Sequence, residues 1–218
     1  MNFFSQTNPP AQEQSLLKIN TGSLLDSLDT EMRAKVLEQR FIKQPLVIAE
    51  NLQAKLIQKA LTQQHAYFDL HLCLFIRSQP TRGTSKIGPM GSVKKRGYRV
   101  IILRNQSFYQ SHIVYLWFTG KLPESNMQMD HIDGNKLNDY PGNLRCVSHA
   151  INHRNNKRDV RNTSGYTGVD FHFSSGRWRA RCAGVYLGIF YSKELAIKAR
   201  QEYINQNPEL GYTTRHGA

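Results

Sequence analysis

The segment 127–156, MQMDHIDGNKLNDYPGNLRCVSHAINHRNN, contains four side chains that together could bind a metal ion and move a proton. Asp130 directly precedes His131, Asn143 lies twelve residues beyond the histidine, and Asn152 lies nine residues further. Oxygens of Asp130 and Asn152 suit one hard cation such as Mg²⁺, whose remaining ligands are water and phosphate oxygens. His131 can take a proton from an attacking water, because imidazole is largely neutral at about pH 7. Asn143 would hold that imidazole in one tautomer and orientation.

These side chains converge only if the segment folds back on itself. Its pattern predicts a strand that reaches His131, a long polar loop, a second strand LRCVS at 144–148, and a short polar helix rich in asparagine and basic residues. Upstream, YRVIIL (98–103) predicts a strand, and HIVYLWFTG (112–120) predicts a buried helix that ends at Gly120.

Two other metal sites fit this segment less well, and a third interpretation needs no metal. A calcium loop of EF-hand type, counted from Asp130, would have Asn135 where glycine is required and Pro141 where glutamate is required. A zinc site would need a second cysteine near Cys146, His149 and His153. The remaining alternative is a polar turn around DHIDGN, with asparagines that only cap the neighbouring elements.

The segment MDHIDGNKLNDYPGNLRCVSHAINHRNN resembles the HNH endonuclease motif, in the branch with asparagine at the third motif position that occurs in phage and intron homing endonucleases. The apolar stretch VYLWFTGKLPE just upstream is similar to the segment that precedes the motif in that family. The resemblance extends over roughly residues 61–158 and implies a ββα-metal finger. It also implies DNA cleavage that leaves 5′-phosphate and 3′-hydroxyl ends.

The resemblance assigns a role to each matching residue. It implies that Asp130 and Asn152 bind one Mg²⁺ or Mn²⁺ ion per site. It implies that His131 is the general base and that Asn143 positions this base. The residues Asp133, Gly134 and Asn135 are interpreted as turn formers. Two further asparagines of the helix could contact the DNA backbone, and a shift of one helical turn would bring the second to the metal: Asn155 and Asn156.

The charge of the chain is strongly positive and unevenly distributed. The 218 residues include 29 Lys and Arg against 16 Asp and Glu, a net charge of +13. Residues 1–60 carry 7 basic and 6 acidic groups, whereas residues 154–200 carry 10 basic and 3 acidic groups. Such clustering indicates a polyanionic partner, usually nucleic acid, which contacts the later segment.

The sequence also bears on the cellular compartment. No apolar run is long enough to cross a bilayer, the N-terminus MNFFSQTNPPAQEQ lacks a secretory pattern, and the three cysteines are far apart and odd in number. We therefore expect a soluble intracellular protein, in the cytoplasm of a bacterial host if the gene belongs to a phage.

A basic strand pattern follows in the last quarter of the chain. The segment GRWRARCAG alternates with period two, which places Arg177, Arg179 and Arg181 on one face of a strand and Trp178, Ala180 and Cys182 on the other. Residues 166–205 predict three such strands and a final helix from Ser192. An outward row of arginines can lie in a major groove, where it contacts phosphates and guanine edges.

The segment SGYTGVDFHFSSGRWRARCAGVYLGIFYSKELAIKARQEY resembles the DNA-binding domain of the Apetala/ethylene-response-factor type, which also occurs at the C-terminus of HNH homing endonucleases. Ile197 and Lys198 depart from the small pair that the family usually has in its helix. The basic linker NKRDVRNTSG before it would add DNA contacts from Lys157, Arg158 and Arg161. The alternative is an exposed basic hairpin that binds DNA without recognising a particular base sequence.

Two helices are expected near the N-terminus. The segment 23–41 predicts a helix with Ser23 as N-cap and with one apolar face formed by Leu24, Leu28, Met32 and Val36. The segment 46–64 predicts a second helix whose apolar face is formed by Leu52, Leu56 and Ala60.

We therefore predict an α+β fold in three parts: a helical extension (1–60), an HNH nuclease domain (61–158), and a linker with a three-stranded antiparallel sheet packed on one helix (159–218). The predicted function is that of a metal-dependent homing endonuclease that acts on double-stranded DNA, as a monomer or a homodimer, without a membrane. The alternative is a sequence-specific DNA-binding regulator with a catalytically silent finger.

Overall fold

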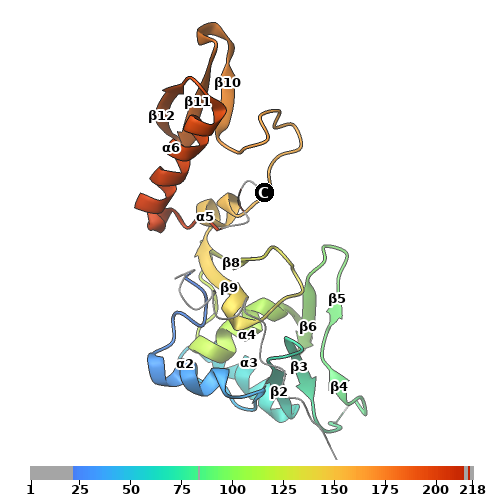
Figure 1. Cartoon of the computed structure of the whole chain (residues 1–218). Coiled ribbons are helices and arrows are strands. Elements are labelled where there is room, and N and C mark those ends of the chain that lie inside the picture. The colour runs from blue at the N-terminus through green and yellow to red at the C-terminus, as the bar shows by residue number, and fades with distance from the viewer. Residues whose placement is uncertain (1–21, 83, 214–215, 217–218) are drawn as a thin grey trace, which may run out of the picture.

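A computed structural model describes residues 22–82, 84–213 and 216, and Figure 1 shows the ribbon. The polar N-terminal tail, on which the expectation about secretion rests, lies outside these residues. The described chain forms a larger lobe that ends near residue 148 and a smaller lobe of sheet and helix beyond residue 165 (Figure 1). Its mixture of helices and antiparallel strands is consistent with the predicted α+β class.

Two antiparallel sheets frame the larger lobe. The first has the order β1-β2-β3-β4 and consists of β1 (Phe41–Ile42), β2 (Ala66–Asp69), β3 (Leu74–Arg77) and β4 (Gly88–Pro89). The second has the order β5-β6-β7 and consists of β5 (Ser92–Val93), β6 (Arg99–Leu103) and β7 (Gln106–Tyr109). Strand β6 confirms the strand that was predicted at 98–103.

Helix α4 (Gln110–Thr119) lies at the centre of the core of the larger lobe. Its apolar side chains are fully buried, namely Ile113, Val114, Leu116, Trp117 and Phe118. The helix ends at Gly120, as predicted, in the left-handed region at φ 70°. Only glycine fits there without strain, since a Cβ would also lie 2.8 Å from Cγ1 of Val47.

The described part of the expected N-terminal extension packs into this same core. Leu24 and Val36 are buried in one cluster with Trp117. Helix α2 (Thr30–Leu37) begins later than predicted, because Asp29 is its N-cap and accepts the Met32 N–H at 2.8 Å. The prediction of Ser23 as N-cap is therefore wrong. The Ser23 hydroxyl instead donates to Asp26 within a turn that precedes the helix.

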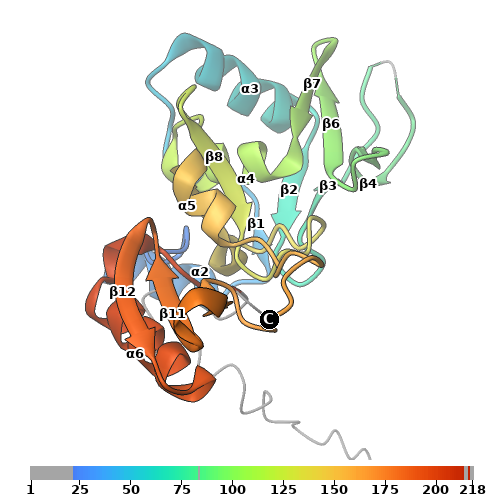
Figure 2. The ribbon, with the colours of Figure 1, turned by 90° about the horizontal axis from the view of Figure 1, so that it is seen from above.

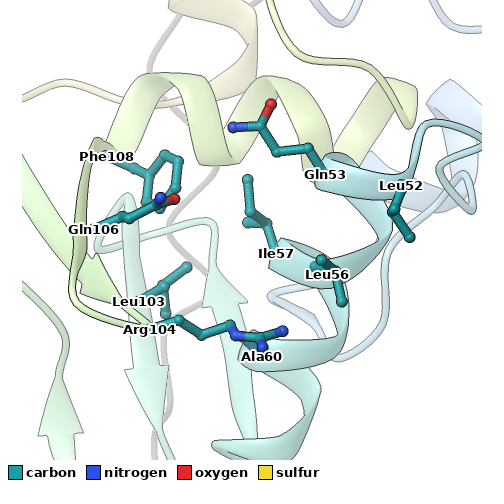
Figure 3. A pocket seen from close by; sticks show the side chains of 9 residues that line it. All are labelled: Leu52, Gln53, Leu56, Ile57, Ala60, Leu103, Arg104, Gln106 and Phe108. Carbon is teal, nitrogen blue, oxygen red and sulfur yellow. The ribbon is translucent and has the colours of Figure 1, made fainter.

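Helix α3 (Leu52–Gln63) lies within the predicted segment 46–64 but begins later, after its N-cap Asn51. Of the predicted apolar face, Ala60 is buried as expected, whereas Leu52 and Leu56 are not. Its buried side chains include Ala54, Ile57, Gln58 and Leu61, whose spacing of three and four residues defines the helix side toward the core. Gln58 fixes this orientation, since its amide bonds with the backbone of residues 47, 49 and 116. Leu52 and Leu56 are 72% and 38% exposed and line an open groove of about 410 Å³ against the β6–β7 hairpin (Figure 3).

A hairpin and a short helix follow at the boundary between the lobes. Strand β8 (Met127–His131) pairs antiparallel with β9 (Leu144–Ser148), after a 3-10 turn at Pro141–Asn143. Helix α5 (His149–Arg154) starts directly after β9, with Ser148 as its N-cap. Figure 2 shows this helix lying against the hairpin. The strand, loop, strand and helix predicted for this segment are confirmed.

The smaller lobe is an antiparallel sheet of order β10-β11-β12 covered by one helix. It consists of β10 (Val169–His172), β11 (Arg177–Cys182), β12 (Val185–Phe190) and α6 (Lys193–Gln206), with Ser192 as the helix N-cap. Its own small core contains Val169, Ala180 and Ala196. On this helix Leu195 is 49% exposed, whereas Ile197 packs against the small core.

Candidate active site

The site is built on the β8–β9 hairpin and α5, which we call the finger (127–155). In the hairpin, Asp130 faces Arg145 and His131 faces Leu144 across the antiparallel ladder. Leu144 is fully buried in the core of the larger lobe, so the end of β8 is held against that core. This placement explains why Asp130, the predicted metal ligand, and His131, the predicted base, are each only 5% exposed.

Asp130 is fully engaged by neighbouring side chains. Its Oδ2 accepts from Nε of Arg145 at 2.8 Å, and Nη2 of the same guanidinium also lies 2.8 Å away. Its Oδ1 accepts from Nδ2 of Asn155 at 2.9 Å. A buried carboxylate requires such partners, since an unpaired charge in the interior is very costly.

Asn155 is the helix-end residue that the fold brings to Asp130. It follows the last turn of α5, is 1% exposed, and also donates to the His131 carbonyl at 2.9 Å. Asn152 lies one turn earlier and donates to Oε1 of Gln128 at 2.6 Å, two residues before Asp130 on the same strand. The structure thus joins Asn155 to Asp130 and places Asn152 beside Gln128. The assignment of Asn152 as a metal ligand stays a prediction.

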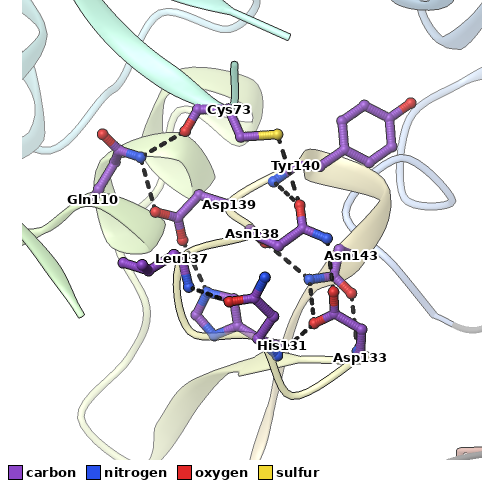
Figure 4. Close-up of polar contacts among 10 residues, drawn as sticks. Cys73, Gln110, His131, Asp133, Leu137, Asn138, Asp139, Tyr140 and Asn143 are labelled. Carbon is purple, nitrogen blue, oxygen red and sulfur yellow. Dashed lines mark hydrogen bonds and ion pairs between the residues drawn. The ribbon is translucent and has the colours of Figure 1, made fainter. Parts of the chain in front are cut away.

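His131 is held by a residue that the sequence reasoning missed. Its Nε2 lies 2.9 Å from Oδ1 of Asp139, which is 2% exposed (Figure 4). The other carboxylate oxygen of Asp139 accepts from Nε2 of Gln110 at 2.8 Å. Asp139 stands eight residues after the histidine in an irregular loop, where no periodicity marks it. A carboxylate near a candidate base was the one available signal.

Asn143 does not hold the imidazole, so that expectation is corrected. Its Oδ1 accepts from the Asp133 backbone N–H at 2.9 Å. Its Nδ2 donates to Oδ1 of Asp133 at 2.9 Å and to the Asn138 carbonyl at 2.8 Å. Since both ends of the amide are used within the loop, Asn143 fixes the course of the loop between the strands (Figure 4).

The surroundings of Asp139 are buried and polar. Gln110 also donates to the Cys73 carbonyl at 2.8 Å, which ties this loop to the larger lobe. Burial, together with the negative charges of Asp139, Asp69 and Asp133, raises the pKa of the Cys73 thiol to about 11. The thiol is therefore neutral and chemically inert near neutral pH.

The residues of the finger do not fit a bound cation in this arrangement. Within the part of the chain that is described, no group of three or more His, Cys, Asp or Glu side chains is placed to hold a metal ion. The residues of the zinc alternative, Cys146, His149 and His153, therefore do not form such a group. Asp130 is the one carboxylate at the expected position, and the guanidinium of Arg145 already neutralises it. A cation at this carboxylate would have to replace that guanidinium.

The segment 210–213, which follows α6, also contacts the finger, at Arg145, Arg154 and Asn155. Arg145 Nη1 donates to the Gly211 carbonyl and Arg154 Nη1 donates to the Leu210 carbonyl, both at 2.9 Å. The hydroxyl of Thr213 donates to Oδ1 of Asn155. The two residues that hold Asp130 are therefore themselves held by the end of the smaller lobe, an interaction that spans more than fifty residues of sequence.

The arginine strand alternates as predicted. Ala180 and Cys182 are buried and Trp178 packs on the small core, while Arg177 and Arg181 are exposed on the opposite face. The arginines are not three independent cations, however. Asp170 of β10 pairs with Arg179 at 2.7 Å and with Arg181 at 3.2 Å, and the guanidinium of Arg177 lies 4.2 Å from the ring centroid of Tyr191.

The linker residues are open to solvent. Lys157 and Arg158 are exposed. Arg161 is exposed as well, but it pairs with Asp159 at 2.7 Å. Their predicted contacts with DNA stay predictions.

The finger is thus a strand hairpin with a helix across it and an Asp-His pair at the end of its first strand. Residues 108–154 of the chain match the protein family described as HNH endonuclease. This match begins in β7, includes α4, β8 and β9, and ends at the last residue of α5. No curated protein and no solved structure matches the chain.

This match supports a nuclease activity, and an HNH nuclease domain implies DNA as the substrate. HNH nucleases generally depend on a divalent metal ion. Among the residues that the structure describes, no helix has the length and apolar character needed to cross a membrane.

Proposed function

We propose that this protein is a metal-dependent DNA endonuclease of the HNH homing type, which hydrolyses a phosphodiester bond to leave 5′-phosphate and 3′-hydroxyl ends. The observation that carries the proposal is the position of His131, a buried imidazole at the end of β8 whose Nε2 is engaged by Asp139, inside the segment that matches the HNH family. A side chain fixed in this way is suited to proton transfer, because its orientation does not have to be found at each turnover.

In the proposed reaction, His131 takes a proton from a water molecule whose oxygen forms a bond with the scissile phosphorus. The bond between phosphorus and the 3′ oxygen breaks, that oxygen takes a proton from solvent water to leave as a hydroxyl, and His131 then returns its proton to solvent. The ion required by the proposal is Mg²⁺ or Mn²⁺, one per site, with Asp130 and Asn152 as its proposed ligands. Since Arg145 occupies the Asp130 carboxylate here, no step of the reaction is assigned to the ion.

The smaller lobe is proposed to hold double-stranded DNA. Its sheet presents Arg177, Arg179 and Arg181 on the face opposite α6, and the linker adds Lys157, Arg158 and Arg161. Guanidinium groups contact phosphates and guanine edges, so this face suits the major groove. One finger per chain makes a nick in one strand the expected event for a monomer, while a double-strand cut would need a homodimer or two sequential nicks.

The alternative, a DNA-binding regulator with a silent finger, has one specific observation in its favour. The ion pair between Arg145 and Asp130 blocks the carboxylate that a catalytic ion would need. A finger with a purely structural role could contain the same buried ion pair.

Nicking of supercoiled plasmid DNA separates the two functions. We expect the wild-type chain to nick plasmid in Mg²⁺ or Mn²⁺ and to stop in EDTA, and we expect His131→Ala to lose about 10²- to 10⁴-fold in rate at unchanged DNA affinity. His149→Ala is a suitable control, because this histidine is exposed on the neighbouring helix. A wild-type chain that binds DNA without nicking it in any divalent ion would instead establish the regulator.

A further inference from the structure

We infer that Asp139 is a positioning residue for the proposed hydrolysis: its carboxylate fixes His131 as the tautomer protonated on Nε2, which leaves Nδ1 to receive the proton from water. The inference rests on the proposed function, because it assigns a role within that reaction. It concerns a residue that lies outside the Asp-His-Asn-Asn set of the motif.

The direction of the hydrogen bond follows from the chemistry of the two groups. An ionised carboxylate can only accept hydrogen bonds, so a ring nitrogen 2.9 Å from Oδ1 of Asp139 must be the donor. A neutral imidazole carries one N–H, and with that hydrogen on Nε2 the lone pair lies on Nδ1. In the part of the chain that the structure describes, no hydrogen bond engages Nδ1 of His131. The ring is thus held at one nitrogen and left available at the other.

The carboxylate of Asp139 is itself prevented from rotating. One of its oxygens faces His131 and the other accepts from Gln110, the first residue of α4. Gln110 is fully buried, and its Nε2 is further fixed by the Cys73 carbonyl at 2.8 Å. Figure 4 shows this line of contacts from Cys73 through Gln110 and Asp139 to the imidazole. The orientation of the histidine is therefore set by the most deeply buried helix of the larger lobe.

This arrangement also explains what Asn143 does in this chain. Its Nδ2 donates to the Asn138 carbonyl, which belongs to the residue directly before Asp139. Its Oδ1 and Nδ2 also hold Asp133, at the start of the same loop. Asn143 thus acts on the backbone that carries Asp139, and Asp139 acts on the imidazole. The positioning of His131 passes through the loop and not through a direct contact with Asn143.

The first test uses the wild-type full-length chain and needs no substitution in the site. In protein with ¹⁵N-labelled histidine, the two ring nitrogens are distinguished by NMR at an alkaline pH where imidazole is neutral, and the His131 signal is identified by its loss in His131→Ala. We expect His131 to be protonated on Nε2. A His131 protonated on Nδ1, or an even mixture of the two tautomers, would overturn the inference whether or not the protein cleaves DNA.

The second test is Asp139→Asn, which keeps the shape of the side chain but offers Nδ2 as a donor to the ring. We expect the His131 tautomer to shift toward Nδ1–H, and kcat for plasmid nicking to fall by about 10²-fold or more at unchanged KM, because the base atom is now protonated. Asp69→Asn is the matched control, since Asp69 is also 2% exposed but lies at the end of β2 and caps the backbone of residues 71 and 72.

The outcomes keep the two proposals apart. If wild type nicks DNA, His131→Ala does not, and Asp139→Asn keeps its full kcat, then the endonuclease assignment stands and the role of Asp139 is refuted. If wild type cleaves nothing, the proposed function fails, while the tautomer measurement still decides whether Asp139 orients the ring. A loss of kcat in Asp69→Asn equal to that in Asp139→Asn would show a general effect of buried charge and would also refute the inference.

Discussion

Arg145 lies directly opposite Asp130 on the β8–β9 ladder, and its guanidinium donates to the Asp130 carboxylate at 2.8 Å while both side chains are almost completely buried. The same guanidinium donates to the carbonyl of Gly211, beyond the last helix. The charge of the carboxylate is thus balanced inside the fold by an arginine that also anchors the C-terminal segment. In most buried ion pairs, removal of one partner destabilises far more than the pair itself stabilises.

The first prediction concerns Arg145→Met, which keeps a long apolar side chain but removes the guanidinium. Without a divalent ion, we expect the free energy of unfolding to fall by about 3–5 kcal/mol, because Asp130 is left buried and uncompensated. Mn²⁺ at millimolar concentration should then raise the melting temperature of the variant more than that of wild type, since a cation can replace the missing charge. Thermal unfolding with Mn²⁺ and with EDTA measures both effects.

Arg161→Met provides the control for this experiment. Arg161 also pairs with an aspartate at 2.7 Å, but the pair is exposed and screened by solvent, so little change in stability is expected. If Arg145→Met unfolds at the wild-type temperature and does not respond to Mn²⁺, the ion pair with Asp130 has no energetic importance and the carboxylate is not a cation site.

The second prediction compares the two asparagines at the end of the finger. Asn155→Ala should lower the free energy of unfolding by roughly 1–3 kcal/mol, because it removes buried hydrogen bonds to Asp130 and to the His131 carbonyl. Asn152→Ala should change stability by less than about 1 kcal/mol, since among the described residues its side chain bonds with Gln128 alone, in an exposed contact. Urea unfolding of both variants gives the comparison.

Nicking rates of the same two variants test the metal assignment. If Asn152 binds the ion, Asn152→Ala should lose most of its activity while its stability is kept. Full activity of Asn152→Ala, together with inactivity of a folded Asn155→Ala, would move the proposed metal ligand from Asn152 to Asn155.

The sequence was sufficient for the parts of the site that depend on local patterns. Strand periodicity placed β8 and β9, Ser192 marked the start of α6, and the glycine after α4 marked its end, because each of these signals acts within a few residues. The partners of the reactive side chains were not predictable in this way. Asp139 lies in an irregular loop, and Arg145 has the appearance of an ordinary strand residue.

Long-range contacts limited the prediction in the same manner. Nothing near Asn155 in the sequence indicates that Thr213 donates to it, since these residues meet only after the smaller lobe has folded back. The face of α3 was partly mispredicted for a related reason. A buried glutamine, Gln58, replaces an apolar residue at the core and is paired with backbone groups that the sequence does not reveal.

The third prediction concerns pH and the C-terminal segment. Burial and the neighbouring charge of Arg200 lower the pKa of His216 to about 4, from an ordinary value of 6.5. Its Nε2 lies 2.9 Å from Nη2 of Arg200, which requires the neutral ring. Because the folded protein disfavours the charged form, the contribution of His216 to stability is complete above about pH 6.5 and is lost as the pH falls toward about 4.

Equilibrium unfolding of wild type and His216→Gln checks this sign. Glutamine can accept from Arg200 but does not titrate, so the variant should lose less stability than wild type between about pH 6.5 and about pH 4. Identical pH dependence of the two proteins would mean that His216 is protonated equally in the folded and unfolded chains.

The last prediction concerns the arginine face of the smaller lobe, where Asp170 lies between Arg179 and Arg181. An arginine that is bidentate to a guanine should cost roughly 1–3 kcal/mol of binding when changed to alanine and should relax preference at one base pair. An arginine that meets only phosphate should weaken all sequences alike and reduce the salt slope by about one. Arg177→Ala, Arg179→Ala and Arg181→Ala can be compared in titrations of the full-length chain at several salt concentrations.

Asp170→Asn tests whether Asp170 orients the two arginines for DNA recognition or only reduces the positive charge of this face. The substitution removes one negative charge from the face, so binding to random DNA should strengthen and become more sensitive to salt. If the carboxylate also holds Arg179 and Arg181 in the orientation that contacts the bases, preference for the target site should fall in the same variant, because the two guanidinium groups lose a fixed orientation. Leu195→Ala, on the exposed side of α6, is the control for an effect on the lobe itself. If Asp170→Asn raises affinity for target and random DNA equally, Asp170 only reduces the positive charge of the face. The arginines would then adopt their bound orientation only on contact with DNA.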